Sequence, residues 1–248
     1  MRLISLCPSI TQLVFDFGLG EHLVGVTRFC IHPAEGVANI EKVGGTKDPD
    51  IQRIAASNPD LVLMNREENR REDWETLQNK GLNCHVSEPE TVDETIETVL
   101  DLGRVLGVES KAKSMAEAIK VARERVHESC KSLKNKTWAY LIWRKPWMTV
   151  NGTTYINHLI SETGATNVFA DHNTRYPAVS AQQLAEANPD LVFLSSEPFP
   201  FKQKHAVELA ELTSLPIERF RLVDGELLSW HGCFTRDGLL YAAELIGA

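Results

Sequence analysis

The sequence predicts an α/β protein built from two similar lobes, and two patterns carry this prediction. Residues 54–64 read IAASNPDLVLM and residues 184–194 read LAEANPDLVFL, so a helix end, an Asn-Pro-Asp turn and an apolar strand recur 130 residues apart. A period this long indicates duplicated domains. Between the copies, residues 91–133 carry apolar side chains three and four positions apart, which is typical of helix with one buried face. We therefore expect two Rossmann-like lobes with parallel sheets, joined by one long backbone helix, with a ligand cleft between the lobes.

The repeat has a simpler alternative, because Asn-Pro-Asp is also a common turn. In each copy, however, the proline ends a helix, and the apolar run after it is typical of an interior parallel strand. We place an N-terminal α/β lobe at residues 1–90, the connecting backbone helix at 91–134 and a C-terminal α/β lobe at 135–248. Thr91 and Glu94 form a capping-box pattern at the start of that helix, and Gly107-Val108 marks a pause within it.

Strands and helices are expected to alternate in both lobes. The first lobe has predicted strands at residues 3–6, 23–27, 61–64 and 85–87, with a helix capped by Ser9 and further helices from Pro49 and Trp74. The second lobe has predicted strands at residues 138–143, 167–170, 191–195 and 220–223. Its helices are expected at residues 153–163, after Ser180 as an N-cap, at 205–212 and from Thr235.

Composition narrows the class of protein. The chain has 248 residues, 43% of them apolar, which is enough for a core in each of two lobes. A formal net charge of −8 without a long basic run argues against nucleic acid and anionic membranes as partners. No transmembrane segment is expected, because no window approaches the roughly 20 apolar residues of a membrane span. We expect a globular monomer.

The compartment is left open between two alternatives. The five cysteines are odd in number, scattered and never spaced as C-x-x-C, which favours free buried thiols in a reducing compartment. The N-terminal MRLISLCPSITQLVF carries Ser and Pro where a signal peptide has its apolar run, and is typical of a first strand and helix. The sequence as given therefore indicates a cytoplasmic protein, and a periplasmic one if a signal has been removed.

The chain shows no motif for catalysis. Gly44-Gly45 lacks the G-x-x-x-x-G-K-[ST] frame of a P-loop, and Gly18, Gly20 and Gly25 follow a helix where a dinucleotide fingerprint would open one. There is no G-x-S-x-G elbow and no H-E-x-x-H pair. We therefore predict no enzyme, no catalytic residue, no bound metal and no cofactor of its own.

The loops that follow the strands are the candidate ligand-binding region. In open α/β sheets, ligands bind outside the carboxyl ends of the strands. Large aromatic side chains in such loops favour a flat, partly apolar ligand, and Arg144, Arg175 or Lys145 would meet its carboxylates or phosphate. The predicted ligand-binding residues are Ser9, Phe29, His32, Thr46, Asn65, Arg66, Trp143, Arg144, Trp147, Tyr155, Arg175, Tyr176, Ser196, Phe199, Trp230 and His231.

Each of these residues has an ordinary alternative. An aromatic side chain can pack only its own loop, and the charged run at 66–73 is most simply a solvated loop. His231 could reach a metal carried by the ligand, although a single histidine is more often a hydrogen-bonded structural residue.

Three segments together resemble a known family. VGGTKDPDIQRIAASNPDLVLM at 43–64, MTVNGTTYINHLISETGATNVFAD at 148–171 and VSAQQLAEANPDLVFL at 179–194 are similar to the substrate-binding proteins of ABC importers for metal chelates, the cobalamin, haem and ferric-siderophore type with a helical backbone. The resemblance implies transport without catalysis: a metal chelate held in the cleft and passed to a membrane permease. It also implies that Trp230 lines the cleft and that Asn65 replaces a second aromatic residue of cobalamin-binding relatives. Acids that would dock the permease are Glu68 or Glu72 on the first lobe and Glu197 on the second.

Two rival functions fit the same fold. A receptor for free Zn²⁺ or Mn²⁺ would need three or four converging ligands, and His32, His172 and His231 are available. A two-lobed transferase would need a phosphate-binding loop and a strongly perturbed acid or base.

Overall fold

The computed structural model describes residues 1–131, 133 and 135–247, and the chain divides into two compact units. Unit 1 comprises Met1–Pro89, Asp93–Ala116 and His231–Cys233, and unit 2 comprises Glu90–Val92, Glu117–Trp230 and the chain from Phe234 onward. Each unit thus includes a three-residue segment whose sequence neighbours belong to the other. The predicted boundary at residue 134 lies outside the described residues.

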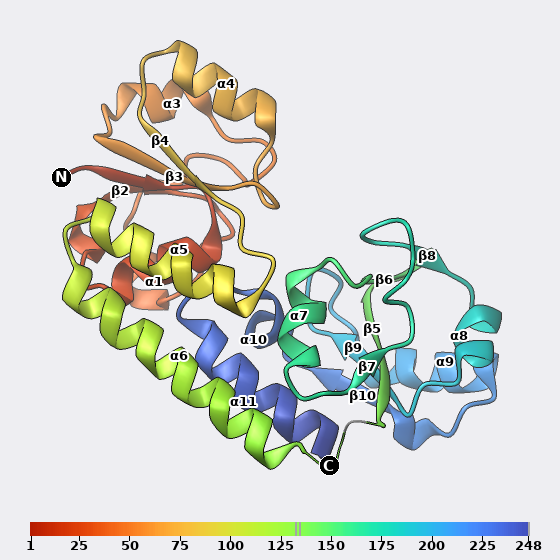
Figure 1. Cartoon of the computed structure of the whole chain (residues 1–248). Coiled ribbons are helices and arrows are strands. Elements are labelled where there is room, and N and C mark those ends of the chain that lie inside the picture. The colour runs from red at the N-terminus through yellow and green to blue at the C-terminus, as the bar shows by residue number, and fades with distance from the viewer. Residues whose placement is uncertain (132, 134, 248) are drawn as a thin grey trace. The chain divides into compact units, whose positions relative to one another are not determined.

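Unit 1 contains a four-stranded parallel sheet in the order β2-β1-β3-β4. Its strands are β1 (Leu3–Ser5), β2 (Leu23–Val26), β3 (Leu61–Asn65) and β4 (Cys84–Ser87). Helices α3 (Ile51–Ala56) and α4 (Arg71–Asn79) cover one face, and α1 (Pro8–Asp16) and α5 (Val92–Val105) cover the other (Figure 1). Helix α2 (Ala34–Val37) and the 3₁₀ turn η1 (Gly20–His22) complete the unit. The four predicted strands and their parallel arrangement are confirmed.

Unit 2 contains a six-stranded sheet whose main path is β10-β9-β5-β6-β8, with β7 paired to β5. Its strands are β5 (Thr137–Trp143), β6 (Trp147–Thr149), β7 (Thr166–Asn167), β8 (Ala178–Val179), β9 (Leu191–Ser195) and β10 (Phe220–Val223). The predicted parallel pairing is confirmed for β10, β9, β5 and β7, whereas β6 runs antiparallel to both β5 and β8, so this sheet is mixed. The chain reverses at residues 144–146, where Lys145 takes the left-handed conformation with φ of +68°.

The helices of unit 2 are α7 (Tyr155–Ser161), α8 (Ala181–Ala187), α9 (Gln203–Thr213), α10 (Gly225–Ser229) and α11 (Phe234–Gly247), with a 3₁₀ turn η2 (Ile217–Arg219). Ser180 caps α8 as predicted, in a reciprocal capping box with Gln183. The main core cluster joins the interior strands to α8 and α9 through buried residues such as Leu141, Leu184 and Leu209.

The segment predicted as the connecting helix contains two helices, one on each side of the predicted pause, and the second is the expected long helix. Helix α5 ends at Val105 and the 21-residue α6 (Glu109–Ser129) begins three residues later. Gly107 takes a φ of +71°, which interrupts the helical hydrogen bonding, so the predicted pause is a complete break. No helix in the described part of the chain is both long and apolar enough to cross a membrane.

The two Asn-Pro-Asp copies have the same conformation. Asn58 and Asn188 take φ of +45° and +47°, in the left-handed region that asparagine tolerates better than most residues. Asp60 Oδ2 accepts the backbone N–H of Arg2 over 2.6 Å, and Asp190 Oδ2 accepts that of Thr137 over 2.8 Å. Each aspartate thus fixes its turn to the start of the neighbouring parallel strand, β1 or β5.

Candidate functional site

The candidate residues of unit 1 gather around His231. Asn65, the last residue of β3, lies with its Nδ2 3.1 Å from His231 Nε2, and the Ser9 hydroxyl lies 3.4 Å from the same nitrogen. All three side chains are buried. Because an amide nitrogen only donates, Nε2 is the acceptor and the ring proton is on Nδ1. Burial lowers the pKa of His231 to about 4, so the ring is neutral at pH 7.

Ser9 reaches His231 because it does not cap its helix. Cys7 occupies the N-cap position of α1 and Pro8 the first helical position, which corrects the predicted cap at Ser9. The hydroxyl of Ser9 lies 3.2 Å from Cys7 Sγ. The side chain is therefore part of a buried polar group with Cys7 and His231.

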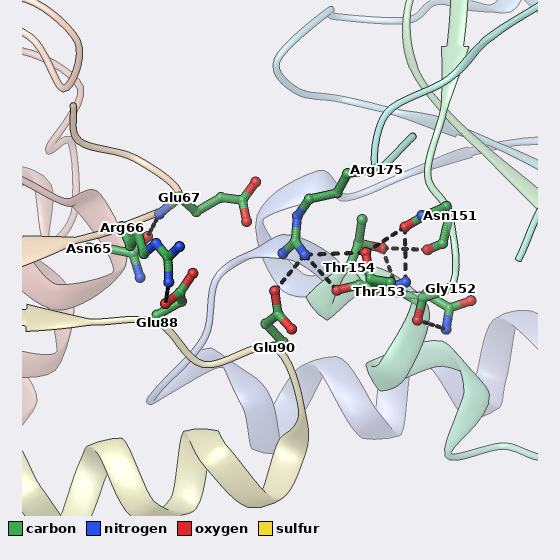
Figure 2. Close-up of polar contacts among 11 residues, drawn as sticks. Asn65, Arg66, Glu67, Glu88, Glu90, Asn151, Gly152, Thr153, Thr154 and Arg175 are labelled. Atoms are coloured by element: carbon green, nitrogen blue, oxygen red, sulfur yellow. Dashed lines mark hydrogen bonds and ion pairs between the residues drawn. The ribbon is translucent and has the colours of Figure 1, made fainter. Parts of the chain in front are cut away.

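Asn65 also shapes the loop after β3. Its Oδ1 accepts the backbone N–H groups of Glu67 and Glu68 over 2.9 and 3.1 Å; Figure 2 draws the first of these bonds. The backbone N–H of Asn65 donates to Asn69 Oδ1 at 2.9 Å, and Asn69 Nδ2 donates to the carbonyls of Leu6 and Thr46, each at 3.0 Å. Asn69 was missed in the sequence, and its only signal was its place in a loop after a strand.

The charged loop of unit 1, residues 66–73, carries both exposed and partly buried charged side chains. Arg66 is exposed and pairs with Glu88 (Figure 2). The Glu68 carboxyl is half-buried and bonded to Thr46, and desolvation raises its pKa. Glu68 therefore faces inward, and we withdraw it as a docking acid. Glu72 is exposed on α4 and keeps the surface position that docking requires.

The remaining candidates of unit 1 differ in exposure. Phe29 is 48% exposed, with the Arg28 guanidinium 4.8 Å above its ring. His32 is half-buried, and Thr46 is buried.

In unit 2, aromatic candidates form a cluster at the carboxyl end of β5 and in the loop after β9. Trp143, 41% exposed, meets Phe199 edge-on with 5.8 Å between ring centroids. Phe199 packs against Phe201 at 4.8 Å, and Trp147 stacks on Phe201 at 6.1 Å. The structure thus brings together three predicted residues, and it adds Phe201, which the sequence analysis had not selected.

Arg144 lies beside this cluster and is held by an acid. Its guanidinium forms two hydrogen bonds, of 2.7 and 3.0 Å, to the Glu208 carboxylate on α9 and lies 5.5 Å from the centroid of the Trp147 ring. The Arg144 contact lowers the pKa of Glu208, because a cation favours the ionised carboxyl.

A second polar group of unit 2 surrounds Arg175 (Figure 2). Arg175 Nη1 lies 2.6 Å from Glu90 Oε1 and 2.7 Å from the carbonyl oxygen of Thr153. Asn151 Oδ1 accepts from both the backbone N–H and the hydroxyl of Thr153, which fixes the turn before α7. Tyr176 is half-buried next to Arg175, whose guanidinium lies 6.0 Å from the centroid of its ring.

The other candidates of unit 2 are more enclosed. The Trp230 indole is buried and donates from Nε1 to Glu197 Oε1 at 2.8 Å, and the Ser229 hydroxyl donates to the same oxygen. Glu197 was predicted as a docking acid, and the structure instead gives its carboxylate a role in holding Trp230. Tyr155 is buried with its hydroxyl 2.8 Å from Thr235 Oγ1, so we reassign it to the core.

A pocket of about 390 Å³ opens at the carboxyl ends of β9 and β10. Ser196, a predicted residue, lines it and accepts the backbone N–H of Gly225 at 2.8 Å. The other lining residues are Leu194, Phe201, Leu222, Val223, Asp224 and Glu226. Among the described residues, no group of three or more His, Cys, Asp or Glu side chains is arranged to hold a metal ion.

Two α/β units that present aromatic and hydrogen-bonded polar residues from the loops after their strands define a protein that binds a ligand. The chain belongs to the periplasmic binding protein family, whose model matches residues 3–213. Membership of a family of binding proteins agrees with the prediction that the chain is not an enzyme.

The relatives that match include vitamin B12-binding and haem-binding proteins. The vitamin B12-binding protein of Vibrio parahaemolyticus is 27% identical over 194 residues, covering 78% of this chain and 70% of the relative. That of Yersinia pestis is 27% identical, covering 78% and 69%. The solved vitamin B12 binding protein of Vibrio cholerae is 22% identical with a TM-score of 0.86, covering 99% and 96% of the two chains. A periplasmic haem-binding protein of Roseiflexus shares the fold with a TM-score of 0.87, at 18% identity and 99% and 97% coverage.

Proposed function

We propose that this chain captures a metal chelate of the corrinoid, haem or ferric-siderophore kind and passes it to an ABC-type permease for import. The observation that carries the proposal is the family match over residues 3–213, together with relatives named as vitamin B12-binding proteins. The resemblance noted in the sequence points to the same class.

The loop residues are suited to such a ligand. Exposed aromatic faces, including Phe29 and Trp143, would bury apolar parts of a flat macrocycle, at roughly 25 cal/mol per Å² of apolar surface. Loops that are already fixed by internal hydrogen bonds, such as 65–69 and 151–153, lower the ordering that binding requires. That the ligand lies between the two units stays a prediction from the sequence.

Compartment and partner form a further part of the proposal. The family takes its name from the periplasm, and we propose that this chain works there beside a permease. Glu72 is the exposed candidate for the permease contact in unit 1. The protein itself would act as a monomer.

A binding panel tests the proposal. Purified protein is titrated with cobalamin, cobinamide, haemin and a ferric hydroxamate while tryptophan fluorescence is followed, with calorimetry as a second readout. We expect one of these chelates to bind at a single site with a dissociation constant in the micromolar range or below. Failure of every chelate to bind would contradict the proposal.

The free-metal alternative requires a different result. Protein purified without chelators would carry about one zinc or manganese per chain if this alternative held. We expect sub-stoichiometric metal, because the described residues contain no ready group of three metal ligands.

A further inference from the structure

Two arginines predicted to contact the ligand are each paired with an acid of the same unit. In unit 1, Arg66 Nη1 pairs with Glu88 Oε2, just after β4. In unit 2, Arg175 Nη1 lies 2.6 Å from Glu90 Oε1 (Figure 2). Neither acid was among the predicted site residues.

The third predicted arginine, Arg144, is also paired with an acid. Arg144 is held by Glu208 through two hydrogen bonds of 2.7 and 3.0 Å. The loop after β3 adds two further acids, Glu67 at the surface and the half-buried Glu68. Each of the three predicted arginines therefore has an acid beside it, and none of these acids was among the predicted site residues.

We propose that the chelate taken by this chain has a neutral or cationic periphery, and that Glu88 and Glu90 discriminate against chelates with peripheral carboxylates. This inference rests on the proposed function and specifies the ligand class within it. It revises the expectation that Arg175 binds a carboxylate or phosphate of the ligand.

The physical reason is competition for the same guanidinium. A ligand carboxylate that binds Arg66 displaces or crowds Glu88, so two anions share one cation and much of the attraction is cancelled. An amide carbonyl carries no net charge and meets no such repulsion. A guanidinium has five N–H donors, so one that is paired with a carboxylate can also donate to an amide oxygen.

Matched ligands isolate this charge effect. Cobalamin is compared with cobalamin in which one peripheral amide is hydrolysed to a carboxylate, haemin with haemin whose propionates are amidated, and a ferric hydroxamate that bears a free carboxylate with its amide. For whichever chelate binds, we expect the amide form to bind at least about fivefold more tightly than the carboxylate form. This preference should shrink as ionic strength rises from about 0.05 to about 0.5 M, because salt screens the repulsion.

Substitution identifies the acids responsible. In Glu88→Gln, Glu90→Gln and the double variant, the preference for the amide form should fall, to about twofold or less when both acids are replaced. Glu75→Gln is the matched control, because Glu75 forms an exposed ion pair with Arg71 within α4. We expect that variant to keep the wild-type preference.

The outcomes separate this inference from the proposed function. Equal or tighter binding of the carboxylate form by the wild type overturns the inference and leaves chelate binding intact. A preference that survives in the double variant overturns the assignment to Glu88 and Glu90. Failure of all chelates to bind overturns the proposed function, and the inference with it.

Discussion

Trp230 donates its indole N–H to Glu197 Oε1 over 2.8 Å, and this bond joins the C-cap of α10 to the loop after β9. The Ser229 hydroxyl donates to the same oxygen at 2.8 Å. Both donors would lose an acceptor together if the carboxylate were removed. Glu197 therefore supports the fold of unit 2 locally, whatever else it contacts.

Replacing this acid should lower stability. We expect Glu197→Ala to reduce the free energy of unfolding by about 1 to 3 kcal/mol, because it leaves the buried Trp230 N–H unsatisfied. Glu197→Gln should lose less, since its amide oxygen can still accept. Urea unfolding measures both, with Glu186→Ala at an exposed position of α8 as control. Equal stability of all three variants would contradict the structural role.

The His231 cluster predicts how stability depends on pH. The pKa of His231 falls from 6.5 to about 4 on folding, so between these values the unfolded chain binds more protons. The free energy of unfolding should therefore rise with pH across that window. At pH 4 it should be about 3 kcal/mol lower than at pH 7 because of this residue. The comparison is wild type with His231→Gln in urea unfolding at pH 4 to 7. If the variant loses as much stability as the wild type on acidification, another group is responsible.

Both duplicated turns should lose stability when alanine replaces the asparagine. Asn58→Ala and Asn188→Ala each force alanine to take a positive φ, which costs about 1 to 2 kcal/mol. Asn58→Gly should be close to neutral, because glycine adopts this conformation freely. Asn188→Gly should cost about 1 kcal/mol, because it also removes the hydrogen bond that Arg219 Nη1 donates to Asn188 Oδ1 at 2.7 Å. Thermal unfolding of the four variants checks both expectations. A large loss in only one copy would show that the two turns differ in role.

The interior strands were predictable because they are short apolar runs bounded by turn residues. The Asn-Pro-Asp turns before β3 and β9 made the duplication visible in the sequence alone. Strands β6 and β8 were not predictable, since three and two residues are too few to show alternation. Their antiparallel pairing depends on the reversal at Lys145, a residue type that seldom takes a positive φ.

The sequence suggested which loops hold the candidate residues, but it did not show which residues contact one another. The sequence placed the candidate residues in the loops after the strands, and the structure brings two of them, Ser9 and Asn65, together around His231. Asn65 and Ser9 precede His231 by 166 and 222 positions in the sequence, so no local pattern predicts their contacts with it. The pairing of Arg66 with Glu88 and of Arg175 with Glu90 is likewise tertiary.

Replacing the exposed Trp143 should weaken ligand binding and change the stability of the protein only slightly. Its indole is 41% exposed and contacts Phe199 edge-on, so Trp143→Ala should lower the free energy of unfolding by about 1 kcal/mol or less. If the aromatic cluster contacts the chelate, removing one aromatic face should weaken binding about fivefold to tenfold. Leu212→Ala is the control, because Leu212 is 56% exposed on α9 and outside the loops after the strands. Calorimetric titration with the chelate identified by the panel measures the change. Unchanged affinity in a stable Trp143→Ala variant would remove this cluster from the binding site, and the search would move to Phe29 and Tyr176.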